Sequence, residues 1–395
     1  MSKIKNNHIF TSESVSEGHP DKICDQISDA ILDECIKLDP LSRVACETLT
    51  TTNLVVNAGE ITCKYWDEIN PEVLARKVVD QIGYNNDELK FSSQSFEYIN
   101  RIHSQSKDIS QGVTEGEGVD KEQGAGDQGM MFGYADNSTS EFMPAPIAFS
   151  HRLLDELQKL RKDNSIPYLR PDSKSQVSVR YQNGIPVEID SIVISHQTNE
   201  NISLNQIQKD MTSVAKEVLY STGLITPNTK FIINPTGRFV IGGPHGDAGL
   251  TGRKIIVDTY GGVGSHGGGA FSGKDPSKVD RSAAYYARYA AKNIVASGLA
   301  DKCEIQVAYA IGISEPLSIN VDTFGTSSVD EKNISEMLAS SEIFDFKPSN
   351  LIDDLQLLHP FGWCYQDTAS YGHFGRDKFP WEKTDKIDQI VNALE

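Results

Sequence analysis

The apolar residues of this chain recur with a helical period in some segments and alternate with polar residues in others. Apolar side chains at every third or fourth position predict an amphipathic helix over 21–38. Two strand-like runs, 43–50 and 54–62, are close enough to pair as a hairpin. A second helix is predicted over 71–82 and a further strand over 96–102. This part of the chain therefore predicts the order helix, hairpin, helix, strand.

The same order is predicted twice more, at intervals of roughly 130 residues. The second pass is predicted as helix 151–162, strands 176–182 and 185–195 around an Asn-Gly turn, helix 203–221 and strand 230–234. The third pass is predicted as helix 279–297, strands 303–311 and 317–324, and helix 329–339. The pattern indicates an α+β fold of three similar units, each a sheet with helices on one face.

The composition is that of an acidic globular protein. Hydrophobic residues make up 38% and charged residues 23% of the 395 residues, and the formal net charge is −18. This charge argues against nucleic acid and anionic membranes as partners, and no apolar run approaches the roughly 18 residues of a membrane span. The six cysteines form no C-x-x-C pair, so zinc binding is not expected. We expect a cytoplasmic protein with reduced thiols.

One stretch, residues 237–284, departs from this acidic background. Between Gly237 and Gly273 lie 13 of the chain's 31 glycines, which allow sharp turns and close approach to a ligand. The same stretch carries five basic side chains: Arg238, Arg253, Lys254, Lys274 and Lys278. Basic side chains on backbone-rich loops predict a polyphosphate site. The alternative is that the glycines only form surface turns and the basic residues only improve solubility.

Two familiar nucleotide-binding motifs occur within this stretch, but neither has the context that it requires. Residues 262–267 fit G-x-G-x-x-G after a predicted strand at 254–260, yet further glycines and Pro276 prevent the helix that a dinucleotide fold needs. Residues 268–274 fit G-x-x-x-x-G-K, but Asp275 stands where a P-loop has Ser or Thr. We therefore expect neither a Rossmann fold nor a P-loop.

Several long motifs resemble those of the S-adenosylmethionine synthetase family. They are FTSESVSEGHPDK at 10–22, GAGDQG at 124–129, HGGGAFSGKDPSKVDRSA at 266–283 and FGRDKFPWEKTD at 374–385. The resemblance implies three intertwined two-layer α/β-sandwich domains with pseudo-threefold symmetry. On this basis we expect an N-terminal domain at 8–107, a central domain at 127–240 and a C-terminal domain at 241–395. Segment 105–128, rich in glycine and acidic residues, is expected to be a mobile active-site loop.

The reaction of this family explains why basic residues dominate the motifs. Methionine's thioether attacks C5′ of ATP and expels the triphosphate, which is then hydrolysed to phosphate and diphosphate. A thioether bears no proton, so the alkylation needs neither a general base nor a protein nucleophile. What it needs is stabilisation of the negative charge that grows on the leaving triphosphate. Lysines, arginines and a positioned hydrogen-bond donor are suited to this task.

The resemblance also implies roles for individual residues. The expected catalytic residues are His19, Lys174, Arg253 and Lys274. The expected ATP-binding residues are His19, Lys22, Asp172, Lys174, Arg238, Phe239, Asp247, Arg253, Lys254, Ala270 and Lys274. Methionine is expected to contact Glu60, Gln105, Asp127, Asp247 and Lys278. Asp21 and Asp280 are the expected magnesium ligands, and Glu47 is the expected potassium ligand.

The implied assembly is a homodimer with shared active sites, commonly paired into a homotetramer. Each site would take about two magnesium ions and one potassium ion. Two other functions remain open from the residues alone. One is a kinase that passes the γ-phosphoryl group of ATP to a small metabolite and releases ADP. The other is a catalytically silent regulatory subunit that only binds the nucleotide.

Overall fold

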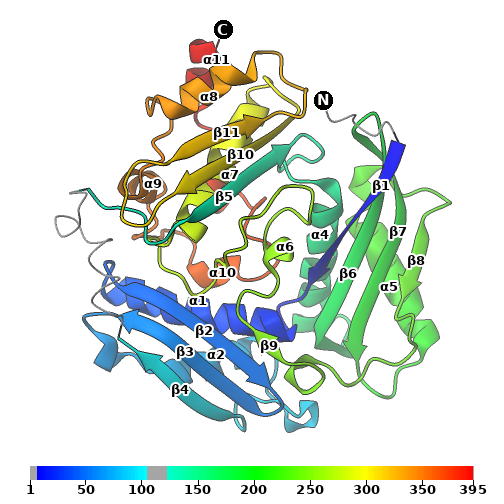
Figure 1. Cartoon of the computed structure of the whole chain (residues 1–395). Helices are drawn as coiled ribbons and strands as arrows, with labels where there is room; N and C mark the ends of the chain where they lie inside the picture. Colours follow the sequence, from blue (N-terminus) through cyan, green and yellow to red (C-terminus); the bar gives the residue numbers. More distant parts are fainter. Residues whose placement is uncertain (1–6, 105–121, 395) are drawn as a thin grey trace.

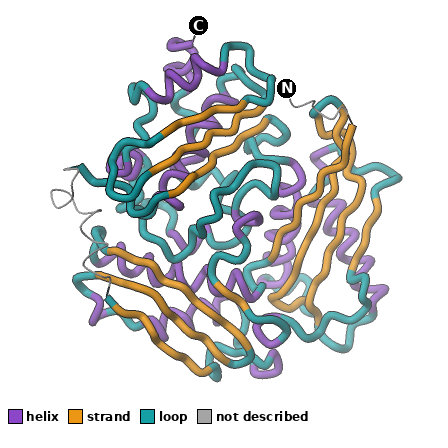
Figure 2. Tube along the Cα trace, in the orientation of Figure 1, coloured by secondary structure: helices purple, strands orange, loops and turns teal. Residues whose placement is uncertain are grey.

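The computed structural model describes residues 7–104 and 122–394, and three β-sheets dominate it (Figure 1). Most of the loop expected at 105–128, including Gln105, lies outside the described residues. Within the described ranges, no helix is long and apolar enough to cross a membrane. The three sheets and their helices are arranged around the middle of the molecule (Figure 2).

The first two units share one order of elements. The first consists of α1 (Pro20–Leu38), β2 (Arg43–Thr51), β3 (Leu54–Thr62), α2 (Pro71–Ile82) and β4 (Glu97–His103). The second consists of α4 (Ala145–Lys162), β6 (Leu169–Gln182), β7 (Ile185–Thr198), α5 (Leu204–Val218) and β8 (Lys230–Ile233). The predicted order of helix, hairpin, helix and strand is confirmed for both units.

The third unit departs from this order after its second helix. It consists of α7 (Val279–Ala296), β10 (Lys302–Tyr309), β11 (Ser318–Asp322) and α8 (Glu331–Ala339). Among the described residues no strand follows α8; the chain continues through the helices α9 (Pro348–Asp354), α10 (Tyr365–Thr368) and α11 (Ile387–Leu394). The helix, two strands and helix predicted for the third pass are therefore confirmed, and the described part of the unit lacks the closing strand that ends the first two.

Each sheet gains an edge strand that comes from a different unit. β1 (Asn7–Val15) precedes α1 in the chain but pairs antiparallel with β6. β5 (Gly129–Asp136) precedes α4 but pairs with β10, and β9 (Gly249–Leu250) precedes α7 but pairs with β2. The resulting sheet orders are β4-β3-β2-β9, β8-β7-β6-β1 and β11-β10-β5. This cyclic exchange of strands intertwines the three units about a pseudo-threefold axis and confirms the predicted fold class.

The helices cover one face of each sheet, so each unit has two layers. α1 packs on β2, α4 on β6, and α7 on β5 and β10. The opposite faces of the sheets are turned toward the viewer in Figure 1. On these open faces apolar side chains remain exposed, including Ile9 at 44%, Leu49 at 39% and Met130 at 51%. A single chain therefore leaves apolar sheet surface uncovered.

The strand predicted at 254–260 is absent, and this prediction is wrong. The segment forms the short helix α6 (Ile255–Asp258), in which the N–H of Asp258 donates to the carbonyl oxygen of Lys254 at 2.9 Å. A run of β-branched residues favours a strand locally. The helical turn instead allows Lys254 and Asp258 to form ion pairs with Asp21 and Lys22 of α1. Ion pairs with distant residues of α1 thus accompany a helical turn where the local sequence favours a strand.

Candidate active site

His19 lies at the N-terminus of α1, the helix around which the site is built. Its Nδ1 accepts a hydrogen bond from the N–H of Asp21 at 3.2 Å and so caps the helix. Burial, followed by the charges of Lys254 and Lys174, lowers the pKa of His19 to about 3. A neutral imidazole whose Nδ1 accepts a hydrogen bond carries its proton on Nε2. His19 is therefore an uncharged hydrogen-bond donor.

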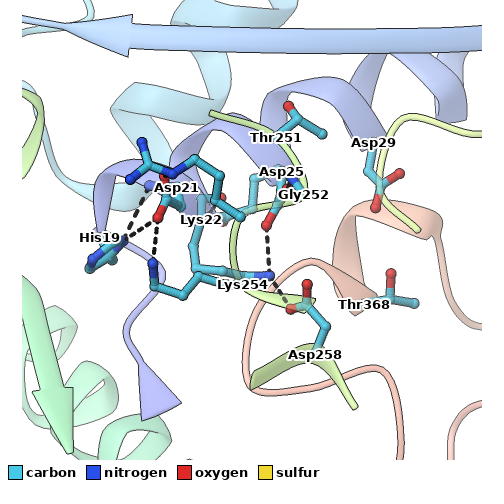
Figure 3. A network of polar contacts seen from close by, with 12 residues as sticks. His19, Asp21, Lys22, Asp25, Asp29, Thr251, Gly252, Lys254, Asp258 and Thr368 are labelled. Carbon is cyan, nitrogen blue, oxygen red and sulfur yellow. Dashed lines mark hydrogen bonds and ion pairs between the residues drawn. The ribbon is translucent and has the colours of Figure 1, made fainter. Parts of the chain in front are cut away.

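Asp21 connects this helix terminus to the glycine-rich stretch. Its Oδ2 lies 2.5 Å from Nζ of Lys254, and its Oδ1 accepts the N–H of Leu250 at 3.0 Å (Figure 3). Burial alone would raise the pKa of Asp21, but the hydrogen bonds from Lys254 and Leu250 outweigh it and the pKa is lowered. Nε of Arg253 lies 3.7 Å from Oδ1. One carboxylate thus holds two cations beside His19.

Lys22 is buried within the protein rather than turned toward a ligand. Its side chain has 0% exposure, and Nζ contacts Oδ2 of Asp25 at 2.9 Å and Oδ1 of Asp258 at 2.5 Å (Figure 3). Burial alone would lower the pKa of Lys22, but these two carboxylates raise it above its ordinary value. The ammonium group stays charged and joins α1 to α6.

A row of aspartates along α1 fastens loops that lie far away in the sequence. Asp21, Asp25, Asp29 and Asp33 are four residues apart, so they lie on one face of the helix. Each accepts a backbone N–H at 2.7 to 3.0 Å; the donors are, in order, Leu250, Gly252, Gly273 and Tyr365. The carboxylate of Asp29 also accepts hydrogen bonds from both terminal nitrogens of the fully buried Arg281, at 2.7 and 3.0 Å. The backbone of the glycine-rich stretch is therefore held to α1 at three points.

Lys274 and Asp280 form a second charged group at the start of α7. Nζ of Lys274 lies 2.7 Å from Oδ2 of Asp280, and both side chains are partly exposed, at 27% and 23%. Gly273 has a φ of +80°, and a Cβ there would lie 1.9 Å from the carbonyl oxygen of Cys46. Only glycine fits this approach. The turn at Gly273 therefore fixes where the following lysine emerges.

Two further predicted residues come from β6. Asp172 is buried and accepts the N–H of Gly243 at 2.8 Å. Burial raises the pKa of Asp172 to about 6, although Gly243 and then Lys174 act in the opposite direction. Lys174 is exposed and close enough to His19 to lower the pKa of the imidazole. β6 thus contributes a cation to the same place as the N-terminus of α1.

The remaining predicted residues are less tightly placed. Arg238 pairs with Glu200 at 2.7 Å, with 68% of the arginine side chain exposed, and Lys278 pairs with the buried Asp275 at 2.5 Å. The others within the described residues are exposed or half-buried: Glu47, Glu60, Asp127, Phe239, Asp247 and Ala270. Their assignments to ATP, methionine and potassium stay predictions.

The predicted residues therefore form two groups. The first comprises His19, Asp21, Lys174, Arg253 and Lys254. The second comprises Lys274 and Asp280. Within the described part of the chain, no hydrogen bond or ion pair joins a side chain of one group directly to a side chain of the other. Both groups are nevertheless attached to α1 through its aspartates.

The residues that support these groups lie outside the predicted set, above all Asp25, Asp29, Asp258 and Arg281. A signal for two of them was present, because four aspartates at intervals of four residues on one helix face are unusual beside an apolar core. Asp258 and Arg281 gave no local signal, since their partners on α1 are 236 and 252 residues away.

Oxygen ligands for a metal ion are present but sparse. In the regions that the structure describes, no three His, Cys, Asp or Glu side chains gather to hold an ion. Asp21 and Asp280 each stand beside a lysine in one of the two groups. This donor set fits an ion such as magnesium, which commonly takes one or two carboxylates and completes its shell with phosphate oxygens and water.

Comparisons with known proteins identify the family of the chain. Family models for the N-terminal, central and C-terminal domains of S-adenosylmethionine synthetase match residues 7–107, 122–239 and 241–383. The chain is 56% identical over 396 residues to the S-adenosylmethionine synthase of Treponema denticola, covering 99% of this chain and 100% of the relative. It is 53% identical over 385 residues to that of Sorangium cellulosum, covering 98% and 90%. The chain therefore belongs to the S-adenosylmethionine synthetase family.

Proposed function

We propose that the chain is a methionine adenosyltransferase, which forms S-adenosylmethionine, phosphate and diphosphate from ATP, methionine and water. Two relatives named S-adenosylmethionine synthase match nearly the whole chain. The structural observation that carries the proposal is the neutral His19 donor placed close to Lys174 and Lys254. This combination suits a leaving group that is already anionic and gains charge as its bond to carbon breaks.

In the proposed mechanism His19 acts on the oxygen that leaves C5′. Its Nε2–H donates a hydrogen bond to this oxygen, and the bond strengthens as negative charge develops. The cap on Nδ1 holds the imidazole in the tautomer that can donate. His19 transfers no proton in this step, because the triphosphate leaves as an anion and the attacking thioether has no proton to lose.

The cations of the two groups bind the triphosphate itself. Lys174, Arg253 and Lys254 contact it from the side of α1, and Lys274 contacts it from the start of α7. Arg238 adds a further charge once it exchanges Glu200 for a phosphate, and Phe239 stacks on adenine. Asp172, Asp247 and Ala270 complete the nucleotide site. Lys22 acts by positioning, because it holds Asp258 and Asp25 beneath the site.

Metal ions and methionine complete the proposed site. Asp21 and Asp280 would hold about two magnesium ions, and Glu47 would hold one potassium ion. Magnesium supplies positive charge to the triphosphate when bound. Methionine lies among Glu60, Gln105, Asp127, Asp247 and Lys278, where a carboxylate such as Glu60 can accept its ammonium group.

We further propose a homodimer in which each active site takes residues from both chains. Within the described residues, each of the two charged groups is paired internally and not with the other, which leaves room for the second chain to complete either one. The open sheet faces, with exposed Ile9, Leu49 and Met130, offer apolar surface for a second copy of the chain. Two dimers pair into a homotetramer. All six cysteines are free, which supports a reducing, cytoplasmic environment.

The reaction is tested by incubating the purified protein with ATP, methionine, magnesium and potassium and analysing the products by mass spectrometry. The proposal predicts S-adenosylmethionine, phosphate and diphosphate in equal amounts, with no ADP. Formation of ADP would instead indicate phosphoryl transfer, and unchanged ATP would indicate nucleotide binding without catalysis. The His19→Ala variant serves as the control for contaminating activity.

A further inference from the structure

A cavity of about 200 Å³ lies between α4 and the segment 371–376, apart from the charged groups of the active site. It is lined by Glu141, Met143, Ala148, His151, Arg152, Asp155, Tyr371, Phe374, Gly375 and Arg376. None of these residues belongs to the site described above. The walls combine apolar side chains with several charged ones, so the pairing of each charge decides what the cavity can bind.

Arg376 is the charge in this cavity that lacks a carboxylate partner. Among the described residues it forms no ion pair; Nη2 donates to the carbonyl oxygen of Gly372 at 2.5 Å, and the guanidinium stacks over Phe379 at 4.6 Å. Its Nε is buried and has no hydrogen-bond partner. Burial lowers the pKa of Arg376 to about 10, only partly offset by Asp367 and Asp155. A largely desolvated cation without a carboxylate partner favours an anion beside it.

The other charges that line the cavity are already engaged. Arg152 forms an ion pair with Glu141, and Asp155 pairs with Lys159 on the outer side of α4 at 2.8 Å. Met143 and Phe374 are buried apolar residues of the core, and Ala148 is 8% exposed. The cavity therefore offers one unpaired guanidinium next to apolar walls. This combination fits a small carboxylate that carries an apolar body.

The backbone at the cavity is held in conformations that are costly for most residues. Tyr371 has a φ of 59°, in the left-handed region, and the glycines at 372 and 375 each have a φ of 83°. Such strain in a bulky aromatic residue is concentrated at functional sites more often than elsewhere. The hydroxyl of Tyr371 accepts the N–H of Glu17 at 3.3 Å, and His151 contacts Ser14 at 2.8 Å. The cavity thus adjoins the segment that leads into His19.

We propose that this cavity is a second ligand site, which binds a small carboxylate with an apolar body through the guanidinium of Arg376. The carboxylate accepts from a terminal nitrogen of the Arg376 guanidinium, and the apolar part packs against Met143, Ala148 and Phe374. The site lies outside the proposed substrate-binding residues, so its occupancy does not depend on methionine or ATP.

The test is a ligand-observed NMR titration of the full-length protein with benzoate, using the neutral isostere benzamide for comparison. We expect saturable binding of benzoate and at least about tenfold weaker binding of benzamide, the effect of losing a charged hydrogen-bond pair. Arg376→Gln removes the cation, and Ala148→Leu fills the cavity while leaving every charge in place. Both variants should weaken benzoate binding by at least about tenfold.

Two controls separate this site from the rest of the protein. Lys332→Gln makes the same charge change on the exposed face of α8, where the lysine side chain is 76% exposed, and should leave benzoate binding unchanged. His19→Ala should also retain it, because the cavity does not include the active site. Equal binding of benzamide, full affinity in Arg376→Gln and Ala148→Leu, loss of binding in His19→Ala, or no saturable binding by the wild-type protein would each overturn the proposal.

Discussion

Replacing Lys22 by methionine separates a structural from a ligand-binding role for this lysine. The structure places its ammonium group between Asp25 and Asp258, with 0% exposure for the side chains of Lys22 and Asp25 and 4% for that of Asp258. Lys22→Met keeps a long apolar side chain but leaves two buried carboxylates without their cation. Removing one partner of a buried ion pair typically costs about 3–5 kcal/mol.

The expected change in melting temperature follows from the size of the chain. Unfolding entropy is about 2.1 cal/mol/K per residue, so 395 residues give about 0.8 kcal/mol/K if the chain unfolds as one unit. A loss of 3–5 kcal/mol then lowers the melting temperature by about 4–6 °C. Lys37→Met is the matched control, because Lys37 pairs with Glu34 on the same helix at the same spacing but is 69% exposed. It should change stability by less than about 1 kcal/mol.

Calorimetry of both variants measures the stability effect, and steady-state kinetics measures the KM for ATP. We expect Lys22→Met to melt several degrees below Lys37→Met, with any loss of activity following the loss of folded protein. An unchanged melting temperature together with a large rise in the KM for ATP would refute this reasoning and return Lys22 to the nucleotide site.

Three further predictions concern single residues. Lys274→Ala should lower kcat by about a hundred- to a thousandfold, because the charge of Lys274 matters most as the triphosphate leaves. Methionine binding, measured by calorimetry, should change little. An unchanged kcat would contradict this role. Gly273→Ala should destabilise the protein by about 2 kcal/mol or more in thermal unfolding and should reduce activity. Gly298→Ala is the control, because Gly298 has a similar φ of +79° but open space around it, and it should cost only about 1 kcal/mol. Equal losses of stability in the two variants would show that the close contact with Cys46 is not the cause. Burial lowers the pKa of His196 from 6.5 to about 4, so between these values the unfolded chain binds more protons and stability falls as pH falls. His196→Gln should therefore lose about 2 kcal/mol less stability between pH 7 and 5 than the wild-type protein, and identical melting-temperature shifts would count against it.

Local signals predicted much of the secondary structure. The helices predicted over 21–38 and 71–82 coincide with α1 and α2, and the expected Asn-Gly turn at Asn183-Gly184 marks the β6–β7 hairpin. The edge strands β1 and β5 were missed because each is completed by a strand from another unit, on the far side of a long stretch of sequence. Pairing between distant segments leaves no trace in the periodicity of either one.

The candidate site was predictable in its residues but not in their grouping. Motifs pointed to His19, Asp21 and Lys254, and the structure brings these three together. They could not show that Lys22, adjacent to Asp21 in the sequence, turns into the core, because its partner Asp258 lies 236 residues away. Which lysine faces a ligand and which supports the fold depends on such distant partners.

In the proposed active site the two charged groups act on one triphosphate, with His19 from one chain and Lys274 from another. The direct measurement mixes the inactive variants His19→Ala and Lys274→Ala under conditions that allow subunits to exchange, verified by native mass spectrometry. With random pairing, half of the dimers contain one chain of each kind, and each mixed dimer rebuilds one intact site. Shared sites predict recovery of about a quarter of wild-type activity if the two sites of a dimer are independent. No recovery after verified exchange would place both residues in the site of a single chain and contradict the claim.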